Sequence, residues 1–176
     1  MDDRVSRRGL FALAGGTALA FGLAGAGWRL AGSTPAVAGG FEVTRSEEEW
    51  RRLLTPAQYR VLRGHDTERP GSSPLDDEKR AGTFVCAGCD LPLFESATKY
   101  DSGTGWPSFY APIAGAVGTR ADDSLFMRRT EVHCRRCGGH LGHVFDDGPP
   151  PTGKRYCMNG VAMAFLPKDG GAPASG

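Results

Sequence analysis

The chain has 176 residues, 23% of them charged, and a formal net charge of +1. This length is typical of one domain that buries a substantial core. The balanced charge excludes the basic excess on which nucleic-acid binding depends, so no nucleic-acid partner is expected. Its 26 glycines and 12 prolines favour many turns and short elements over long helices.

The first 38 residues have the order of a secretory signal. Arg7 and Arg8 precede an uncharged hydrophobic region, 9–28, and Ala36-Val37-Ala38 offers a small-x-small cleavage site. The paired arginines after Ser6 resemble a twin-arginine signal, so we expect a cleaved signal peptide and export to the periplasm or beyond the cytoplasmic membrane. The alternative is an uncleaved N-terminal membrane anchor, because about 20 apolar residues can span a bilayer.

Two short helices are expected after a linker at 39–45. Ser46 and Glu49 form the signature of a capping box that opens a helix over 47–54. Thr55, Pro56 and Gln58 repeat this signature with proline at the first helical position. The second helix is expected to end at Arg63, with Gly64 as its C-cap.

The chain from Gly82 onward is expected to be rich in short strands separated by Gly, Pro and Asp clusters. Strands are predicted over 83–86, 124–129, 131–134, 143–145 and 161–166. The small, polar residues 168–176 are expected to be a disordered tail. The fold class is therefore mainly β, with a small helical N-terminal part.

Two Cys-x-x-Cys knuckles, Cys86/Cys89 and Cys134/Cys137, predict a metal site. Four thiolates fill a tetrahedral zinc shell and leave no position open, which indicates a structural Zn²⁺ that contributes to folding. Disulfides are the rival in an exported protein. A bond within one Cys-x-x-Cys is strained, however, and tends to be redox-active.

The fifth cysteine, Cys157, lies in a short polar segment near Arg155 and Asn159. A lone cysteine is more often a small buried hydrophobe than a nucleophile. A nearby guanidinium lowers a thiol pKa and increases the thiolate fraction. From the residues alone, both interpretations stay open.

Further candidate site residues lie beside the second knuckle and in a glycine loop. His140 and His143 follow the knuckle directly and could act as general acids on a rigid platform, or be ordinary surface histidines. The loop over 101–110 presents Trp106, whose indole face can hold a small apolar group. Phe109 in the same loop can equally be a core aromatic.

Taken together, these segments resemble the methionine-R-sulfoxide reductase family (MsrB type). The resemblance runs from Gly64 to Pro167 and rests on blocks such as Gly105-Trp106-Pro107-Ser108-Phe109, His140-Leu141-Gly142-His143-Val144-Phe145 and Arg155-Tyr156-Cys157-x-Asn159. It implies a catalytic domain over 46–167 with the coiled antiparallel β-sheets of the MsrB or Mss4-like type. The zinc site of Cys86, Cys89, Cys134 and Cys137 would lie away from the reaction.

The resemblance also implies the roles of the catalytic residues. Cys157 would attack the sulfoxide sulfur and become a sulfenic acid. His143, with His140 beside it, would protonate the sulfoxide oxygen, and Asn159 would be a hydrogen-bond partner.

The substrate-binding residues that the resemblance implies are Trp106, Phe109, Arg155 and Asp147. Trp106 would pack on the S-methyl group and help to select the R epimer. Arg155 and Asp147 would be supporting charges that tune the thiol and the histidine.

Thr104 departs from the family pattern, because many members carry a resolving cysteine at this position. The chain has no sixth cysteine, so an external thiol such as thioredoxin would have to reduce the sulfenic acid. Gly160 and Asp146 replace the usual Ser and Pro, which affects local loop geometry. The expected substrates are oxidised proteins, and the expected oligomeric state is a monomer.

Two alternative functions stay open at this point. The first is a non-catalytic zinc-ribbon module that binds a protein partner. The second is a single-cysteine thiol peroxidase, which would not explain the Trp106 loop.

Overall fold

The computed structural model describes residues 40–124 and 128–176. The chain divides into two compact units, Met1–Ala36 and Val37–Gly176, and only the second contains described residues. The predicted signal peptide lies outside them. Within the described ranges, no helix is both long enough and apolar enough to cross a membrane.

Two short helices open the described part of the chain. α1 (Glu47–Leu53) and α2 (Pro56–Leu62) both begin with the predicted capping boxes, in which Ser46 exchanges hydrogen bonds with Glu49 and Thr55 with Gln58. The helices contribute Trp50, Val61 and Leu62 to the hydrophobic core. Such short helices depend on this packing, because helices of two turns are unstable alone.

The end of α2 differs from the prediction. The helix ends at Leu62 rather than Arg63, and the left-handed residue beyond it is His65, with φ of 57°, rather than Gly64. Histidine is one of the few non-glycine residues that adopt this conformation readily. Gly64 is needed for another reason: a Cβ there would lie 2.6 Å from the Arg60 carbonyl oxygen.

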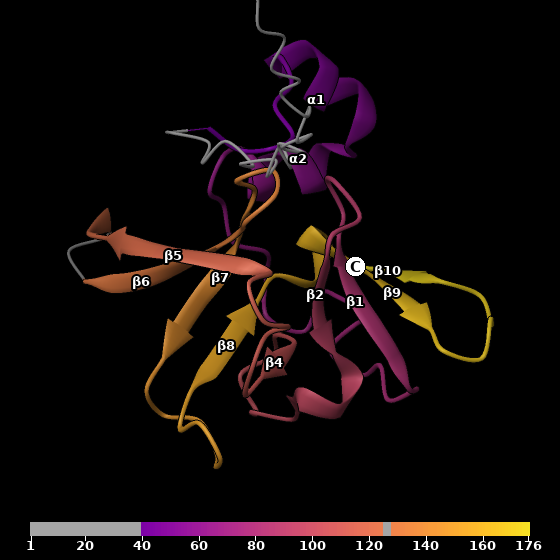
Figure 1. Cartoon of the computed structure of the whole chain (residues 1–176), viewed down its shortest axis with the longest axis vertical. Helices are drawn as coiled ribbons and strands as arrows, with labels where there is room; N and C mark the ends of the chain where they lie inside the picture. The colour runs from indigo at the N-terminus through magenta and orange to yellow at the C-terminus, as the bar shows by residue number, and fades with distance from the viewer. Residues whose placement is uncertain (1–39, 125–127) are drawn as a thin grey trace, which may run out of the picture. The chain divides into compact units, whose positions relative to one another are not determined.

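The described strands form two antiparallel sheets (Figure 1). The four-stranded sheet, in the order β10-β9-β1-β2, contains β1 (Gly82–Cys86), β2 (Pro92–Glu95), β9 (Met163–Pro167) and β10 (Ala174–Ser175). The six-stranded sheet, in the order β3-β4-β8-β7-β6-β5, contains β3 (Lys99–Tyr100), β4 (Ser108–Phe109), β5 (Val117–Asp122), β6 (Arg129–Cys134), β7 (His140–Phe145) and β8 (Arg155–Met158). Two 3-10 turns, η1 (Ser96–Thr98) and η3 (Gly160–Ala162), complete the elements. The predicted fold class is confirmed.

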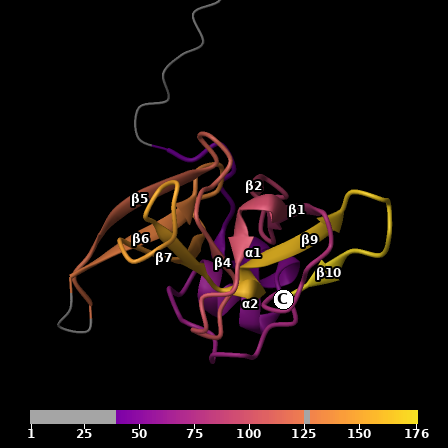
Figure 2. The same cartoon turned by 90° about the horizontal axis from the view of Figure 1, so that it is seen from below.

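An aromatic cluster joins the two sheets, which lie side by side in both views (Figure 1 and Figure 2). Phe94 of β2 stacks on Phe109 of β4 with ring centroids 4.3 Å apart, and Phe84 of β1 meets both Phe109 and Phe165 at 4.9 Å. All four rings are fully buried. Phe109 is therefore a core residue, as the alternative interpretation of its loop expects, and a role in substrate binding stays a prediction without a contact to support it.

Several strands differ from the predicted ones. Of the strand predicted at 124–129, residues 125–127 lie outside the described part, Ser124 and Arg128 are not in a strand, and Arg129 begins β6. β5 itself was missed because its residues are mostly exposed and do not alternate. Within the predicted disordered tail, 168–176, Ala174–Ser175 form β10, which pairs with the side of β9 that β1 leaves open. An open strand edge favours such pairing, because its N–H and C=O groups otherwise lack partners.

Candidate functional site

The four knuckle cysteines gather into one cluster that could hold a metal ion. Their sulfur atoms all lie within 4.8 Å of one another, with Cys86 and Cys137 3.7 Å apart and Cys89 and Cys134 3.5 Å apart. Sulfur atoms about 2.3 Å from a tetrahedral zinc would be about 3.8 Å apart, which agrees with these separations. All four cysteines are free thiols rather than disulfides.

The two knuckles have the same backbone conformation. The residue after each pair is left-handed, Asp90 with φ of 56° and Gly138 with φ of 69°. Its N–H donates to the carbonyl of the first cysteine, over 2.8 Å to Cys86 and 2.9 Å to Cys134. Each knuckle follows directly on a strand, β1 or β6, so the cluster connects the two sheets.

Two arginines contact the backbone of this thiol cluster. Arg63 donates a hydrogen bond to the Cys137 carbonyl over 2.9 Å, and Arg136 donates to the Cys89 carbonyl over 3.1 Å. A divalent ion with four thiolates would carry a net charge of −2, which two guanidinium groups would offset. The donor set therefore fits a closed, structural metal centre.

Cys157 lies at the centre of the six-stranded sheet and lines a separate cavity. It pairs with Ser108 of β4 on one side and with His143 of β7 on the other. The cavity has a volume of about 120 Å³, and its wall includes Trp106, His143, Cys157 and Asn159, together with Thr67, Arg129, Gly142 and Phe145. The structure therefore brings four of the predicted site residues to one cavity.

The environment of the Cys157 thiol acts on its pKa in two directions. Burial raises the pKa, and this effect prevails. The Thr104 hydroxyl, 3.8 Å from Sγ, opposes it, as do the Arg155 guanidinium and Ser108. The expected influence of Arg155 is present, but it does not lower the thiol pKa below its ordinary value.

Trp106 is fixed by the irregular segment that follows α2. Its indole N–H donates to the carbonyl of Glu68 over 3.1 Å, while the Glu68 N–H donates to the side-chain oxygen of Asn159 over 3.0 Å. The Glu68 carboxylate also accepts from the backbone N–H groups of Gly160 and Val161. One residue thereby positions the tryptophan, the asparagine and the turn η3.

Asn159 is 3% exposed and holds the backbone on both sides of the cavity. Its amide nitrogen donates to the Leu141 carbonyl over 3.1 Å, and its oxygen accepts from Glu68. Both ends of the side chain are therefore engaged with the main chain. Its predicted role as a hydrogen-bond partner of the substrate remains a prediction.

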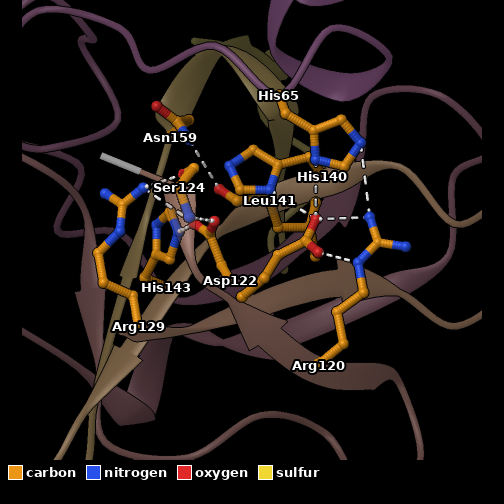
Figure 3. A network of polar contacts seen from close by, with 10 residues as sticks. His65, Arg120, Asp122, Ser124, Arg129, His140, Leu141, His143 and Asn159 are labelled. Carbon is orange, nitrogen blue, oxygen red and sulfur yellow. Dashed lines mark hydrogen bonds and ion pairs between the residues drawn. The ribbon is translucent and has the colours of Figure 1, made fainter. Parts of the chain in front are cut away.

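His143 is paired with an acidic residue that the sequence did not indicate. Its Nε2 lies 2.7 Å from Oδ2 of Asp122, at the end of β5 (Figure 3). The same carboxylate accepts from Arg129 over 2.9 Å and from the Ser124 backbone N–H over 3.0 Å. Hydrogen bonding to the carboxylate holds the pKa of Asp122 well below its usual range. The Ser124 side chain has the largest effect, and His143 has the next largest.

His140 belongs to a second, more deeply buried cluster. Its Nδ1 lies 2.8 Å from Oε1 of Glu131, which also contacts Nδ1 of His65 at 3.1 Å and the Arg120 guanidinium (Figure 3). His140 does not line the cavity at Cys157. Its ring nevertheless meets that of His143 edge to face, with centroids 5.3 Å apart.

Arg155 and Asp147 form a bidentate ion pair near the surface. Nε and Nη2 of Arg155 lie 2.8 and 2.6 Å from the two carboxylate oxygens, and Asp147 is 60% exposed. No hydrogen bond or ion pair joins Asp147 to His143 among the described residues, and its expected influence on the histidine stays a prediction. The carboxylates that pair with the two histidines are Asp122 and Glu131 instead.

Pairing across strands and an irregular segment bring Asp122, Glu131 and Glu68 to the site, and neither is visible in the order of residues. Glu131 lies opposite Arg120 of β5 and His143 of β7, and a bulge between Val132 and His133 shifts the β6–β7 register beyond that pair. The face of β6 that carries Glu131 also carries Arg129 and His133, so the alternation of residues gives no signal that Glu131 is buried. The irregular segment around Glu68 carries no periodic signal either.

Comparisons with known proteins assign the chain to a family. The family model of the SelR domain matches residues 54–167. A protein of Pseudomonas putida is 57% identical over 131 residues, which cover 73% of this chain and 98% of that protein. Proteins of Agrobacterium fabrum and Methanosarcina barkeri are 54% and 55% identical, over 72% and 73% of this chain and 94% and 92% of their own lengths. All three are named peptide methionine sulfoxide reductase MsrB. This chain therefore belongs to the SelR-domain family, that of the MsrB proteins.

Proposed function

We propose that this chain reduces methionine-R-sulfoxide in proteins to methionine, with Cys157 as the attacking thiolate. The observation that carries this proposal is the shared cavity of Cys157, Trp106 and His143, which come from three separate segments of the chain. The names of the curated relatives support the same reaction. A non-catalytic zinc-ribbon module or a thiol peroxidase would not require Trp106 and His143 to share a cavity with Cys157.

The cavity is suited to the reacting end of the substrate alone. A volume of about 120 Å³ is well below that of sites that enclose whole drug-sized ligands, so we expect the cavity to receive the S-methyl sulfoxide end of the side chain. Trp106, Gly142 and Phe145 supply apolar surface for the methyl group, and His143 supplies a polar ring. The backbone of an oxidised protein would therefore stay at the mouth of the cavity.

The reaction transfers one oxygen atom from substrate to enzyme. The Cys157 thiolate attacks the sulfoxide sulfur, and the sulfoxide oxygen is protonated because O²⁻ cannot leave. The products are methionine and a Cys157 sulfenic acid, so the substrate sulfur is reduced and the cysteine is oxidised.

Two external thiol groups would complete the cycle. The first condenses with the sulfenic acid to form a mixed disulfide and water, and the second releases Cys157 as a thiol. The cysteine count supports an external donor, since Thr104 stands beside Cys157 and no sixth cysteine exists in the chain. Thioredoxin or an exported thiol protein is a suitable class of donor.

Zinc is the metal that we propose for Cys86, Cys89, Cys134 and Cys137. The separations of the sulfur atoms agree with tetrahedral zinc–thiolate geometry. Four protein ligands leave no position for substrate, so the ion would supply structural support rather than chemistry.

Stereospecific turnover of the Cys157→Ser variant tests the activity. We expect the wild type to reduce R-sulfoxide peptides with dithiothreitol or thioredoxin, to leave S-sulfoxides intact, and to lose activity in the variant while its zinc content is unchanged. Turnover by Cys157→Ser would contradict the role of the thiol. Reaction with hydrogen peroxide and no turnover of sulfoxides would favour a thiol peroxidase.

We also propose that residues 1–38 direct export through a twin-arginine route. This is supported by Arg7 and Arg8 before the uncharged region 9–28 and by the small residues at 36–38. In a fusion of residues 1–38 to a reporter, Arg7→Lys with Arg8→Lys should block export, whereas Arg4→Lys should not. Export of the double variant would contradict the proposal, and an uncleaved product would indicate a membrane anchor.

A further inference from the structure

Two histidine–carboxylate pairs lie next to each other beside the Cys157 cavity, and they use opposite ring nitrogens. His143 contacts Asp122 through Nε2, whereas His140 contacts Glu131 through Nδ1. Figure 3 shows Asp122 with Ser124 and Arg129 at one pair, and His65 with Arg120 at the other. The rings are close enough to touch, yet each has its own carboxylate.

We propose that Asp122 is a positioning residue for sulfoxide reduction: it holds His143 through Nε2 and thereby makes Nδ1 the atom that delivers the proton to the sulfoxide oxygen. This inference rests on the proposed function of the cavity. It concerns a residue of β5 that is not part of the cavity wall.

The state of the Asp122 carboxylate determines which His143 nitrogen carries hydrogen. Ser124, which also donates its backbone N–H, keeps Asp122 ionised most strongly, and the Arg129 guanidinium donates to the same carboxylate. An ionised carboxylate can only accept hydrogen bonds. His143 Nε2 must therefore carry a hydrogen in both the neutral and the protonated ring, and only Nδ1 can gain or lose one.

His140 has the opposite arrangement and is unsuited to proton donation. Glu131 is held by Arg120 and accepts from His140 Nδ1, so Nδ1 carries the hydrogen in the neutral ring. His140 is 2% exposed, its Nε2 has no partner among the described residues, and burial lowers its pKa. A buried neutral imidazole presents a lone pair at Nε2, which makes His140 an acceptor there.

The groups around His143 are consistent with a proton carrier. Glu131 of β6 and Cys157 of β8 are its partners across the strands. Asp122 of β5 contacts its ring and is itself paired with Arg129, and His140 meets the ring from the same strand. If the Cys157 thiol passes its proton to Nδ1 of His143, the thiol becomes a thiolate and the ring becomes protonated. The pair needs no additional proton from solvent for this step. Transfer of the Nδ1 hydrogen to the sulfoxide oxygen then leaves His143 neutral and Asp122 still ionised.

The test combines ring tautomers, kinetics and a matched control. By nitrogen NMR of the neutral rings, we expect His143 as the Nε2–H tautomer and His140 as the Nδ1–H tautomer. Asp122→Asn should lower kcat roughly tenfold to a hundredfold, with KM and the alkylation rate of Cys157 nearly unchanged. Asp122→Ala should also turn the His143 signal into a mixture of tautomers. Asp123→Asn removes the same charge from an exposed neighbouring residue and is the control. It should have the kcat and the His143 tautomer of the wild type.

The outcomes separate this inference from the proposed function. An Nδ1–H tautomer at His143, or an unchanged kcat in both Asp122 variants, would overturn the role of Asp122. A wild type that turns over no sulfoxide would overturn the proposed function, and the tautomer measurement would still report on the Asp122–His143 pair. Unchanged zinc content and thermal unfolding of the variants exclude loss of fold as the cause.

Discussion

At the scale of single residues, the reactivity of Cys157 depends on a balance between burial and its polar neighbours. Burial raises the thiol pKa, and the Thr104 hydroxyl and the Arg155 guanidinium act against it. Arg155 is itself held by Asp147 and lies over the Phe145 ring at 4.4 Å. Its position is therefore fixed by contacts that do not involve the thiol.

Replacement of Arg155 by Met should make Cys157 less reactive near neutral pH. Removal of the positive charge raises the thiol pKa further, so the thiolate fraction falls and the pH midpoint of alkylation moves upward. We expect iodoacetamide alkylation at pH 7 to slow by roughly threefold to tenfold. Lys154→Met is the control, because Lys154 pairs with Asp146 at the surface. Equal alkylation rates in wild type and Arg155→Met would contradict an electrostatic role.

The residues of the site could be predicted from sequence only where a motif carries the chemistry. Cys157, Trp106, His143 and Asn159 stand in distinctive blocks and do meet at one cavity. Asp122 and Glu131 act through pairing across strands, which depends on register and is not visible in the order of residues. Phe109 stands in a distinctive block too, but its ring faces the aromatic core.

At the scale of elements, helix caps were the most informative local signal. Both capping boxes form as expected, because side chain and backbone lie within four residues of each other. The two-residue strands β3, β4 and β10 have no periodicity to detect. β8 is not predicted because its four residues, Arg155 to Met158, show no alternation of polar and apolar side chains, although it occupies the middle of its sheet.

Loss of the Thr55 cap should destabilise the whole domain measurably. α2 has only seven residues, and it carries Val61 and Leu62 into the core. Thr55→Ala removes the hydroxyl that accepts from the Gln58 N–H, which should lower the free energy of unfolding by about 1 kcal/mol. Thr55→Ser keeps a hydroxyl and should retain most of that stability. Urea denaturation of the three proteins checks the order, and equal midpoints for Ala and wild type would contradict it.

At the scale of the whole catalytic unit, two separate sets of contacts join the two sheets. The first is the stack of Phe94 on Phe109, which links β2 to β4. The second is the cysteine cluster, which links Cys86 at the end of β1 to Cys134 at the end of β6. Neither set includes Cys157, so stability and chemistry occupy different parts of the unit.

Removal of the metal should therefore unfold or loosen the domain without any direct effect on the reacting thiol. Without a cation, four closely spaced thiols cannot all be ionised, and the link between β1 and β6 is lost. We expect a chelator to lower the thermal midpoint by about 10 °C or more, and Cys137→Ser to do the same. Cys157→Ser, a matched change of one thiol, should unfold at the wild-type temperature and keep its metal. If the chelated protein unfolds like the untreated one, the aromatic stack alone holds the sheets together, and the cysteine cluster has no structural role.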